Sequence, residues 1–141
     1  MEFTELRKKL SDKGLKITPQ RIAVYEAALQ LKNHPTAENI IDHVWKHYPN
    51  IAIGTVYKVL DTLCEKKLIS RIHTDRDVMR YDAVTEVHHH LYSEESDRIE
   101  DFFDSGLDEL LRDYFKKKQI PDFEISEIKI HISGIFSGSR D

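Results

Sequence analysis

Residues 53–82, IGTVYKVLDTLCEKKLISRIHTDRDVMRYD, pass from one helix pattern into two strand patterns. Apolar residues recur at helical spacing over about 53–67, which predicts an amphipathic helix with a polar outer face. Two short apolar runs follow, at 68–73 and 78–82, on either side of the charged residues 74–77, and they predict a β-hairpin. The inward stripe of the helix comprises Val56, Leu60, Leu63 and Cys64.

Three more helices are predicted before this stretch. The first covers about 3–13 and ends at Gly14, and the second covers about 18–32 and begins with a threonine N-cap followed by proline. A third begins at Thr36 and stops before Pro49. Several short helices followed by a hairpin are typical of a winged helix-turn-helix, whose last helix enters the DNA major groove. The same helices could also form a protein–protein interaction module.

Three consecutive histidines, His88, His89 and His90, stand beyond the predicted hairpin. On an extended strand successive side chains alternate, so His88 and His90 share one face and His89 points to the other. That spacing suits two metal ligands on one surface. A solvated loop or a polar strand face would give the same pattern, so the triplet alone leaves both interpretations open.

The rest of the chain mixes strand and helix patterns. Short strands are predicted at 91–92 and 98–99, and an amphipathic helix at about 105–118. A final strand is predicted over 128–133, where three isoleucines alternate with polar residues. Phe123 and Ile125 are out of phase with these isoleucines, and a bulge near Ser126 would reconcile them. These elements make a thin core, so we expect this half to complete it against a second copy of the chain.

The predicted fold class is therefore α+β. An N-terminal winged helix-turn-helix domain is expected at 1–83, a hinge at 84–87, and a C-terminal α/β dimerisation domain at 88–141.

The charge is divided unevenly along the 141 residues. Residues 1–82 carry 14 Lys and Arg against 11 Asp and Glu, a net charge of +3, whereas residues 83–141 carry 7 against 14, a net charge of −7. This favours a first half that binds a polyanion and a second half that binds cations or pairs with another chain. Ordinary variation in charge between two soluble halves would give the same difference.

Composition also limits the compartment and the chemistry. No run approaches the ~18 apolar residues of a membrane helix, and the N-terminus is too charged for a secretory signal, so a cytoplasmic protein is expected. The single cysteine, Cys64, excludes an intramolecular disulfide and any CxxC metal knuckle, and it is interpreted as a packed small hydrophobe.

Five motifs, taken together and in this order, resemble the ferric uptake regulator family of bacterial metal-responsive repressors. They are Gly14–Arg21 (GLKITPQR), His34–Ala37 (HPTA), Thr55–Tyr57 (TVY), Arg80–Asp82 (RYD) and the triplet His88–His90. The resemblance covers nearly the whole chain. It implies a winged-helix DNA-binding domain, a hinge and an α/β dimerisation domain, with a divalent metal that holds the two domains in a DNA-binding pose.

The resemblance also implies a regulatory metal site. The positions that match the family's ligands are His34, Asp82, His88, His90 and Asp101. These nitrogen and oxygen donors suit Fe(II), Mn(II) or Zn(II). Because the ligands come from both sides of the hinge, metal binding is expected to restrict the freedom between the domains and thereby alter DNA affinity.

The two aspartates favour one branch of the family. The iron-sensing branch usually carries glutamate at these positions, whereas the peroxide-sensing branch carries aspartate, as here at Asp82 and Asp101. In that branch bound Fe(II) reacts with hydrogen peroxide, and ligand histidines matching His34 and His88 become oxidised. Glu100 lies beside Asp101 and offers a second carboxylate at the downstream position. The alternative is a regulator that responds to iron, haem or another metal without sensing peroxide.

An enzyme is not predicted. The sequence contains no HExxH motif and no nucleophile elbow, so a histidine–metal enzyme is only a remote alternative.

The sequence departs from the family at two accessory sites. Most members carry a structural zinc held by two CxxC pairs, but the matching positions here are Ser93, Ser96, Phe136 and Ser139. No structural zinc is therefore expected, and apolar packing or dimer burial should replace its contribution. A possible second metal site matches His89, Asp108 and Glu127, although the family's last ligand aligns with an isoleucine.

DNA contacts are expected from two regions. Thr55, Tyr57 and Lys58 lie on the predicted recognition helix, and Lys16 and Arg21 flank the start of the second helix. Each could be an ordinary solvated residue. As a set they favour double-stranded DNA as the partner, read by a homodimer as an A/T-rich palindromic operator.

Overall fold

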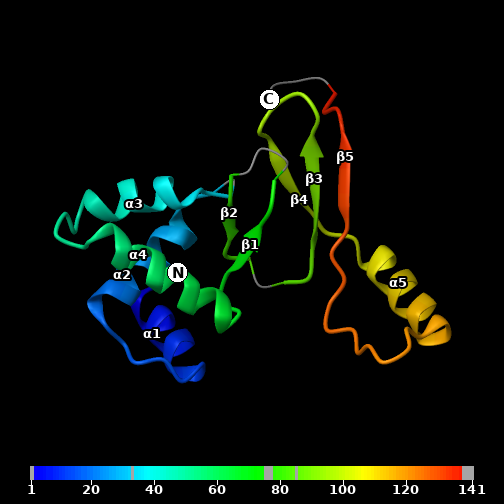
Figure 1. Ribbon diagram of the computed structural model, residues 1–141, viewed down its shortest axis with the longest axis horizontal. Coiled ribbons are helices and arrows are strands. Elements are labelled where there is room, and N and C mark those ends of the chain that lie inside the picture. Colours follow the sequence, from blue (N-terminus) through cyan, green and yellow to red (C-terminus); the bar gives the residue numbers. More distant parts are fainter. Residues whose placement is uncertain (1, 33, 75–77, 85, 138–141) are drawn as a thin grey trace. The chain divides into compact units, whose positions relative to one another are not determined.

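The computed structural model describes residues 2–32, 34–74, 78–84 and 86–137, and the chain divides into two compact units, Met1–Thr85 and Glu86–Asp141. The first unit is helical with a small sheet, and the second is a three-stranded sheet with one helix (Figure 1). The α+β fold class predicted from the sequence is confirmed.

The first unit contains four helices, and the second and third begin at side-chain caps. The helices are α1 (Phe3–Asp12), α2 (Pro19–Gln30), α3 (Ala37–Trp45) and α4 (Ile53–Glu65). The Thr18 hydroxyl accepts the Arg21 N–H at 3.2 Å at the start of α2. A reciprocal capping box between Thr36 and Asn39, with distances of 3.0 and 3.1 Å, begins α3.

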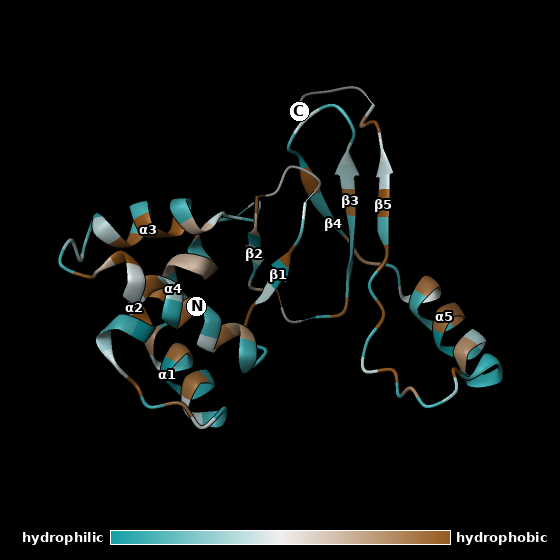
Figure 2. Ribbon diagram, in the orientation of Figure 1, coloured by the Kyte–Doolittle hydropathy of each residue, from teal (hydrophilic) through white to brown (hydrophobic). Residues whose placement is uncertain are grey.

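The core of the first unit is formed by the inward stripes of these helices. Its fully buried side chains include Leu6, Leu10, Val24, Tyr25, Ile40, Val56, Leu60 and Leu63. Figure 2 shows the alternation of apolar and polar residues along these helices. Since α4 uses its inward stripe for this core, its opposite face, including Lys58, is exposed.

The hairpin after α4 is shorter than predicted. Strands β1 (Ser70–Ile72) and β2 (Arg80–Asp82) pair antiparallel, whereas the preceding Leu68 and Ile69 pack into the helical core instead of extending the strand. Residues 75–77 of the predicted tip lie outside the described residues. On the other side of β2, the Tyr81 N–H donates to the Pro35 carbonyl at 2.8 Å. The segment before α3 is therefore fixed against the β1–β2 hairpin.

The second unit is built around strand β3 (His89–Ser93). Strand β4 (Ile99–Phe102) pairs with it antiparallel and β5 (His131–Gly134) pairs with it parallel, so the sheet order is β4-β3-β5. Helix α5 (Ser105–Lys118) connects β4 to the segment that leads into β5. Both strands predicted after the histidines are present, and each is longer than expected.

The last predicted strand, over 128–133, is present only from His131, and its extension back to Phe123 through a bulge near Ser126 is wrong. Residues 123–130 are not in a strand, and β5 begins only at His131. The physical reason is that the apolar side chains of this segment, including Phe123, Ile125 and Ile128, line a groove against α5 instead of pairing in the sheet.

Apolar side chains of the second unit are widely exposed. Within the described residues, α5 contributes no buried side chain, and Leu110 and Tyr114 are 66% and 55% exposed. None of the helices described here has the length and apolar character needed to cross a bilayer.

Candidate metal centre

Two histidines and one aspartate converge on one face of the sheet in the second unit. His88 lies just before β3 and His90 lies on it, while Asp101 lies opposite His90 on β4. The Nε2 atoms of both histidines are 3.5 Å from the same Asp101 oxygen, Oδ1. The two imidazole rings meet edge to face with centroids 4.8 Å apart. His88, His90 and Asp101 are the candidate metal ligands of the second unit.

The tautomer of His88 is fixed by its neighbour. Its Nδ1 lies 2.6 Å from the Glu86 carbonyl oxygen. Because a carbonyl can only accept, Nδ1 carries the proton in the neutral ring, and Nε2 then directs a lone pair towards Asp101. Phe103 stacks on the ring, with centroids 5.2 Å apart. A backbone carbonyl that holds a ligand histidine in this way is a common feature of metal centres.

The structure distinguishes Asp101 from its neighbour Glu100. Successive residues on β4 point to opposite faces, and Glu100 pairs with Arg98, whose Nε donates to the Glu100 carboxylate at 2.6 Å. Asp101 instead faces His88 and His90. Of the two adjacent carboxylates, Asp101 is therefore the candidate ligand.

The first unit holds a second pair of candidate ligands, His34 and Asp82. Both side chains are buried, and a ring nitrogen of His34 lies within 4.8 Å of a carboxylate oxygen of Asp82. His34 has a φ of 61°, in the left-handed region that non-glycine residues rarely occupy. Arg80 donates to the His34 carbonyl at 2.9 Å, and the Val84 N–H donates to Asp82 Oδ1 at 2.9 Å. Both ligands are thus held in place by neighbouring hydrogen bonds.

His89 occupies the opposite face, as the strand alternation predicts. It is completely buried, its Nδ1 accepts the Ile130 N–H at 3.0 Å, and its Nε2 lies 2.6 Å from Asp108 on α5. Since Nδ1 acts as an acceptor, the ring proton is on Nε2 and is donated to Asp108. Glu127 lines the groove that Asp108 also lines. The three residues of the predicted second site thus lie in one region, with His89 engaged through both nitrogens.

The predicted DNA-contacting residues all lie in the first unit. Tyr57 is 43% exposed and Lys58 is exposed on α4, whereas Thr55 is half-buried. Arg21 is also half-buried, and its guanidinium donates to the Lys16 carbonyl at 2.7 Å. Arg21 therefore fixes the loop that carries exposed Lys16.

Sequence reasoning missed the supporting groups of these sites. The Glu86 carbonyl and the ring of Phe103 orient His88, and Arg80 holds the backbone of His34. Arg80 belongs to the RYD motif that ends in Asp82, and its place two residues before this candidate ligand could have indicated a supporting role. A backbone carbonyl and a stacked ring leave no local pattern that would reveal them.

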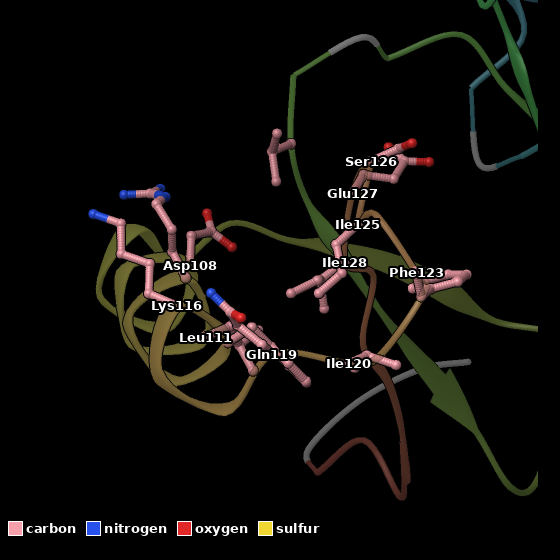
Figure 3. Close-up of a pocket in the computed structure, with 13 residues that line it drawn as sticks. Asp108, Leu111, Lys116, Gln119, Ile120, Phe123, Ile125, Ser126, Glu127 and Ile128 are labelled. Carbon is pink, nitrogen blue, oxygen red and sulfur yellow. The ribbon is translucent and has the colours of Figure 1, made fainter.

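A groove runs between α5 and the segment that follows it (Figure 3). Its volume is about 540 Å³, and side chains from both segments line it. The apolar lining residues are Val87, Leu111, Phe115, Ile120, Phe123, Ile125 and Ile128, and the charged ones are Asp108, Arg112, Lys116 and Glu127.

Comparison with known proteins supports one family. A sequence model of the ferric uptake regulator family matches residues 12–133. The peroxide operon regulator of Bacillus subtilis is 31% identical over 134 residues, which cover 95% of this chain and 90% of that protein. The Campylobacter jejuni peroxide stress regulator has a TM-score of 0.73 at 27% identity, covering 96% of this chain and 97% of that one. The Pseudomonas aeruginosa ferric uptake regulator with manganese has a TM-score of 0.80 at 18% identity, covering 94% and 98%, and this likeness concerns the fold.

Proposed function

Because the chain belongs to the ferric uptake regulator family, we propose that it is a repressor that senses peroxide through bound Fe(II). Members of this family are metal-responsive transcription regulators that bind DNA as dimers and are not enzymes. Relatives named as peroxide regulators, in Bacillus subtilis and Staphylococcus aureus, support this branch of the family. So do the aspartates at both diagnostic positions, Asp82 and Asp101.

The observation that carries the proposal is the convergence of His88 and His90 on Asp101. Two imidazole nitrogens and one carboxylate oxygen, with both Nε2–Oδ1 distances at 3.5 Å, form a cluster of donor atoms that a divalent cation would stabilise. Together with His34 and Asp82 they supply three imidazoles and two carboxylates. This donor set is suited to Fe(II) or Mn(II), would also accept Zn(II) in vitro, and requires no thiolate.

Bound Fe(II) would supply the electron that starts cleavage of the O–O bond of hydrogen peroxide. In the net reaction, one oxygen atom is added to a ring carbon of His34 or His88 and the other leaves in water. The added oxygen changes the electronic structure of the imidazole and weakens it as a ligand. In His88 the Glu86 carbonyl and the Phe103 ring fix the imidazole, so that Nε2 is the nitrogen that would hold the metal.

We further propose that metal binding couples the two domains. His34 and Asp82 belong to residues 1–83, whereas His88, His90 and Asp101 belong to residues 88–141, with the hinge at 84–87. A metal held by all five ligands favours one arrangement of the domains over the others. The shift in this equilibrium is set by the difference between the metal affinities of the arrangements. Loss of the metal restores that freedom and lowers the affinity for DNA.

DNA binding is assigned to the first domain. The exposed Tyr57 and Lys58 on α4, with Thr55 beside them, enter the major groove in this proposal, and Lys16 contacts the backbone with Arg21 supporting its loop. A homodimer reads an A/T-rich palindromic operator, because the two-fold symmetry of the protein matches that of the site.

Dimerisation is assigned to the second domain. Its helix α5 contributes no buried side chain within the described residues, β5 is an edge strand of the sheet, and the groove beside α5 has an apolar lining. Such a surface needs a partner of matching apolar character. A second copy of the chain provides it.

The proposal is tested by DNA binding of metal-stripped protein to a promoter palindrome across added metals. Mn(II) or Fe(II) should tighten binding, and His90→Ala should abolish this effect. After dilute hydrogen peroxide, the Fe(II) form should release DNA and gain the mass of one oxygen on His34 or His88, while the Mn(II) form should retain DNA. Equal binding with and without metal would exclude metal-dependent repression. An Fe(II) form that keeps its DNA and gains no oxygen would make the protein an iron sensor.

A further inference from the structure

The turn between β3 and β4 occupies the position where the resemblance places a structural zinc. Ser93 and Ser96 stand at the first pair of matching positions and Phe136 at the third, while Ser139 lies outside the described residues. A neutral hydroxyl is a weak zinc ligand and a phenyl ring offers no donor atom. These residues do not fit a tetrahedral zinc site.

The serines instead close the turn with hydrogen bonds. The Ser93 hydroxyl accepts the N–H groups of Glu95 and Ser96, each at 3.0 Å. The Ser96 hydroxyl accepts the Arg98 N–H at 3.2 Å, and the Ser93 N–H donates to the Arg98 carbonyl at 3.0 Å. The hydroxyls therefore satisfy backbone donors that the turn would otherwise leave to solvent.

The closed turn is joined to the C-terminal segment by two contacts. The Glu94 N–H donates to the Gly134 carbonyl at 2.9 Å, which continues the pairing of β3 with β5. The guanidinium carbon of Arg98 lies 3.9 Å from the centroid of the Phe136 ring. Arg98 is also ion-paired with Glu100 on β4, so the guanidinium above the ring has a second partner that holds it.

We propose that Ser93, Ser96, Arg98 and Phe136 form a metal-free clasp that fastens the C-terminal segment to the β3–β4 turn in place of the structural zinc. The clasp contains no thiolate for an oxidant to attack and no ion for a chelator to remove. Chelators and dilute peroxide should therefore leave the clasp intact. The contacts of the clasp lie within the second unit and do not depend on the proposed function.

Hydrogen exchange of the full-length, metal-stripped protein tests the clasp, with zinc content measured on the same sample. The reporters are the Glu94 amide and the amides of β5. Arg98→Gln and Phe136→Leu should each speed their exchange roughly two- to fivefold, the range expected for a cation–π contact. The double variant should exceed the larger single effect only slightly, because each substitution removes the same contact.

Two controls separate the clasp from general loosening. Phe136→Tyr keeps the ring and should exchange like the wild type. Arg7→Gln removes another arginine that lies over a phenylalanine ring, at 5.5 Å from Phe3 in the first unit, and should leave the β5 amides unchanged.

Three outcomes would overturn the proposal. The first is a zinc content close to one ion per chain in the stripped protein. The second is faster exchange of the β5 amides when a chelator is added to the wild type. The third is a double variant in which the rate increases caused by Arg98→Gln and Phe136→Leu multiply. Because the measurement uses metal-free protein without DNA, it does not depend on whether the regulatory site senses peroxide.

Discussion

At the scale of single residues, the three histidines have different roles although they are chemically identical. His88 and His90 direct nitrogens to Asp101, whereas both nitrogens of His89 are used in hydrogen bonds to Ile130 and Asp108. His89 therefore joins β3, α5 and the segment before β5. In this arrangement its primary contribution is to the stability of the second unit.

Replacing His89 should destabilise the metal-free protein. His89→Ala leaves the half-buried Ile130 N–H without its acceptor and removes the donor to Asp108 from a fully buried position, so the free energy of unfolding should fall by about 2–3 kcal/mol. Denaturant unfolding of the stripped protein measures the loss, with His73→Ala as the exposed control. A deficit that appears only in metal-loaded protein would instead identify His89 as a ligand.

Adjacent carboxylates provide a matched pair for the regulatory site. Asp101→Asn should weaken Mn(II) binding at least about tenfold, because even partners outside the ligand set contribute that much. Glu100→Gln should leave binding unchanged, since Glu100 faces Arg98. Calorimetric titration of both variants makes the comparison, and an equal loss in both would contradict the assignment of Asp101.

Cys64 should be a bystander during oxidation. Burial raises the pKa of the Cys64 thiol above its usual value, so at neutral pH the thiol is protonated, and the reactive thiolate accumulates only as the pH rises past that raised pKa. Alkylation should therefore be slow at pH 7 and accelerate in alkaline solution. Cys64→Ser should release DNA at the same peroxide dose as the wild type. A variant that tolerates higher doses would make Cys64 part of the sensor.

At the scale of elements, local patterns predicted what local forces determine. Caps at Thr18 and Thr36 and regular apolar spacing were enough to predict α2 and α3, and strand alternation separated His88 and His90 from His89. Phe123 and Ile125 misled the strand prediction because their apolar character serves the groove beside α5.

Contacts between distant residues could not be read from the sequence. The loss of the zinc thiolates was evident, and apolar packing or dimer burial was expected to compensate. The structure also shows hydrogen-bonded serines and an arginine over Phe136, a contact that joins residues 38 positions apart. Arg98 and Phe136 lie close together because β3 pairs with β5. The sequence around either residue therefore does not predict the contact.

Helix α5 provides a test of the dimer. Leu110 is 66% exposed, so Leu110→Glu costs little in a single chain, but burying a charge in an apolar interface is unfavourable. The dimer dissociation constant should rise at least about tenfold, given the ~1.5–3 kcal/mol that a buried leucine contributes. Analytical ultracentrifugation measures it, and Lys117→Glu on the same helix is the control. An unchanged dimer would place the interface elsewhere.

At the scale of the whole molecule, the uneven charge has a measurable consequence. Residues 1–82 carry the positive balance and the exposed Lys58. In the proposed complex Lys58→Gln should weaken binding to all DNA sequences alike and lower the slope of log affinity against log salt by about one per contacting protomer. Fluorescence anisotropy over a range of salt concentrations measures this slope. A loss confined to the operator, with the slope unchanged, would mean that Lys58 reads bases.

The clasp between Arg98 and Phe136 also sets the working range of the molecule. A regulator whose scaffold is destroyed by its own stimulus gives a response that first rises with dose and then collapses as the protein precipitates. Here the serines, the guanidinium and the phenyl ring contain no thiol that dilute peroxide would oxidise. The dose–response curve should therefore reach a plateau, and protein recovered from strong exposure should still be a folded dimer.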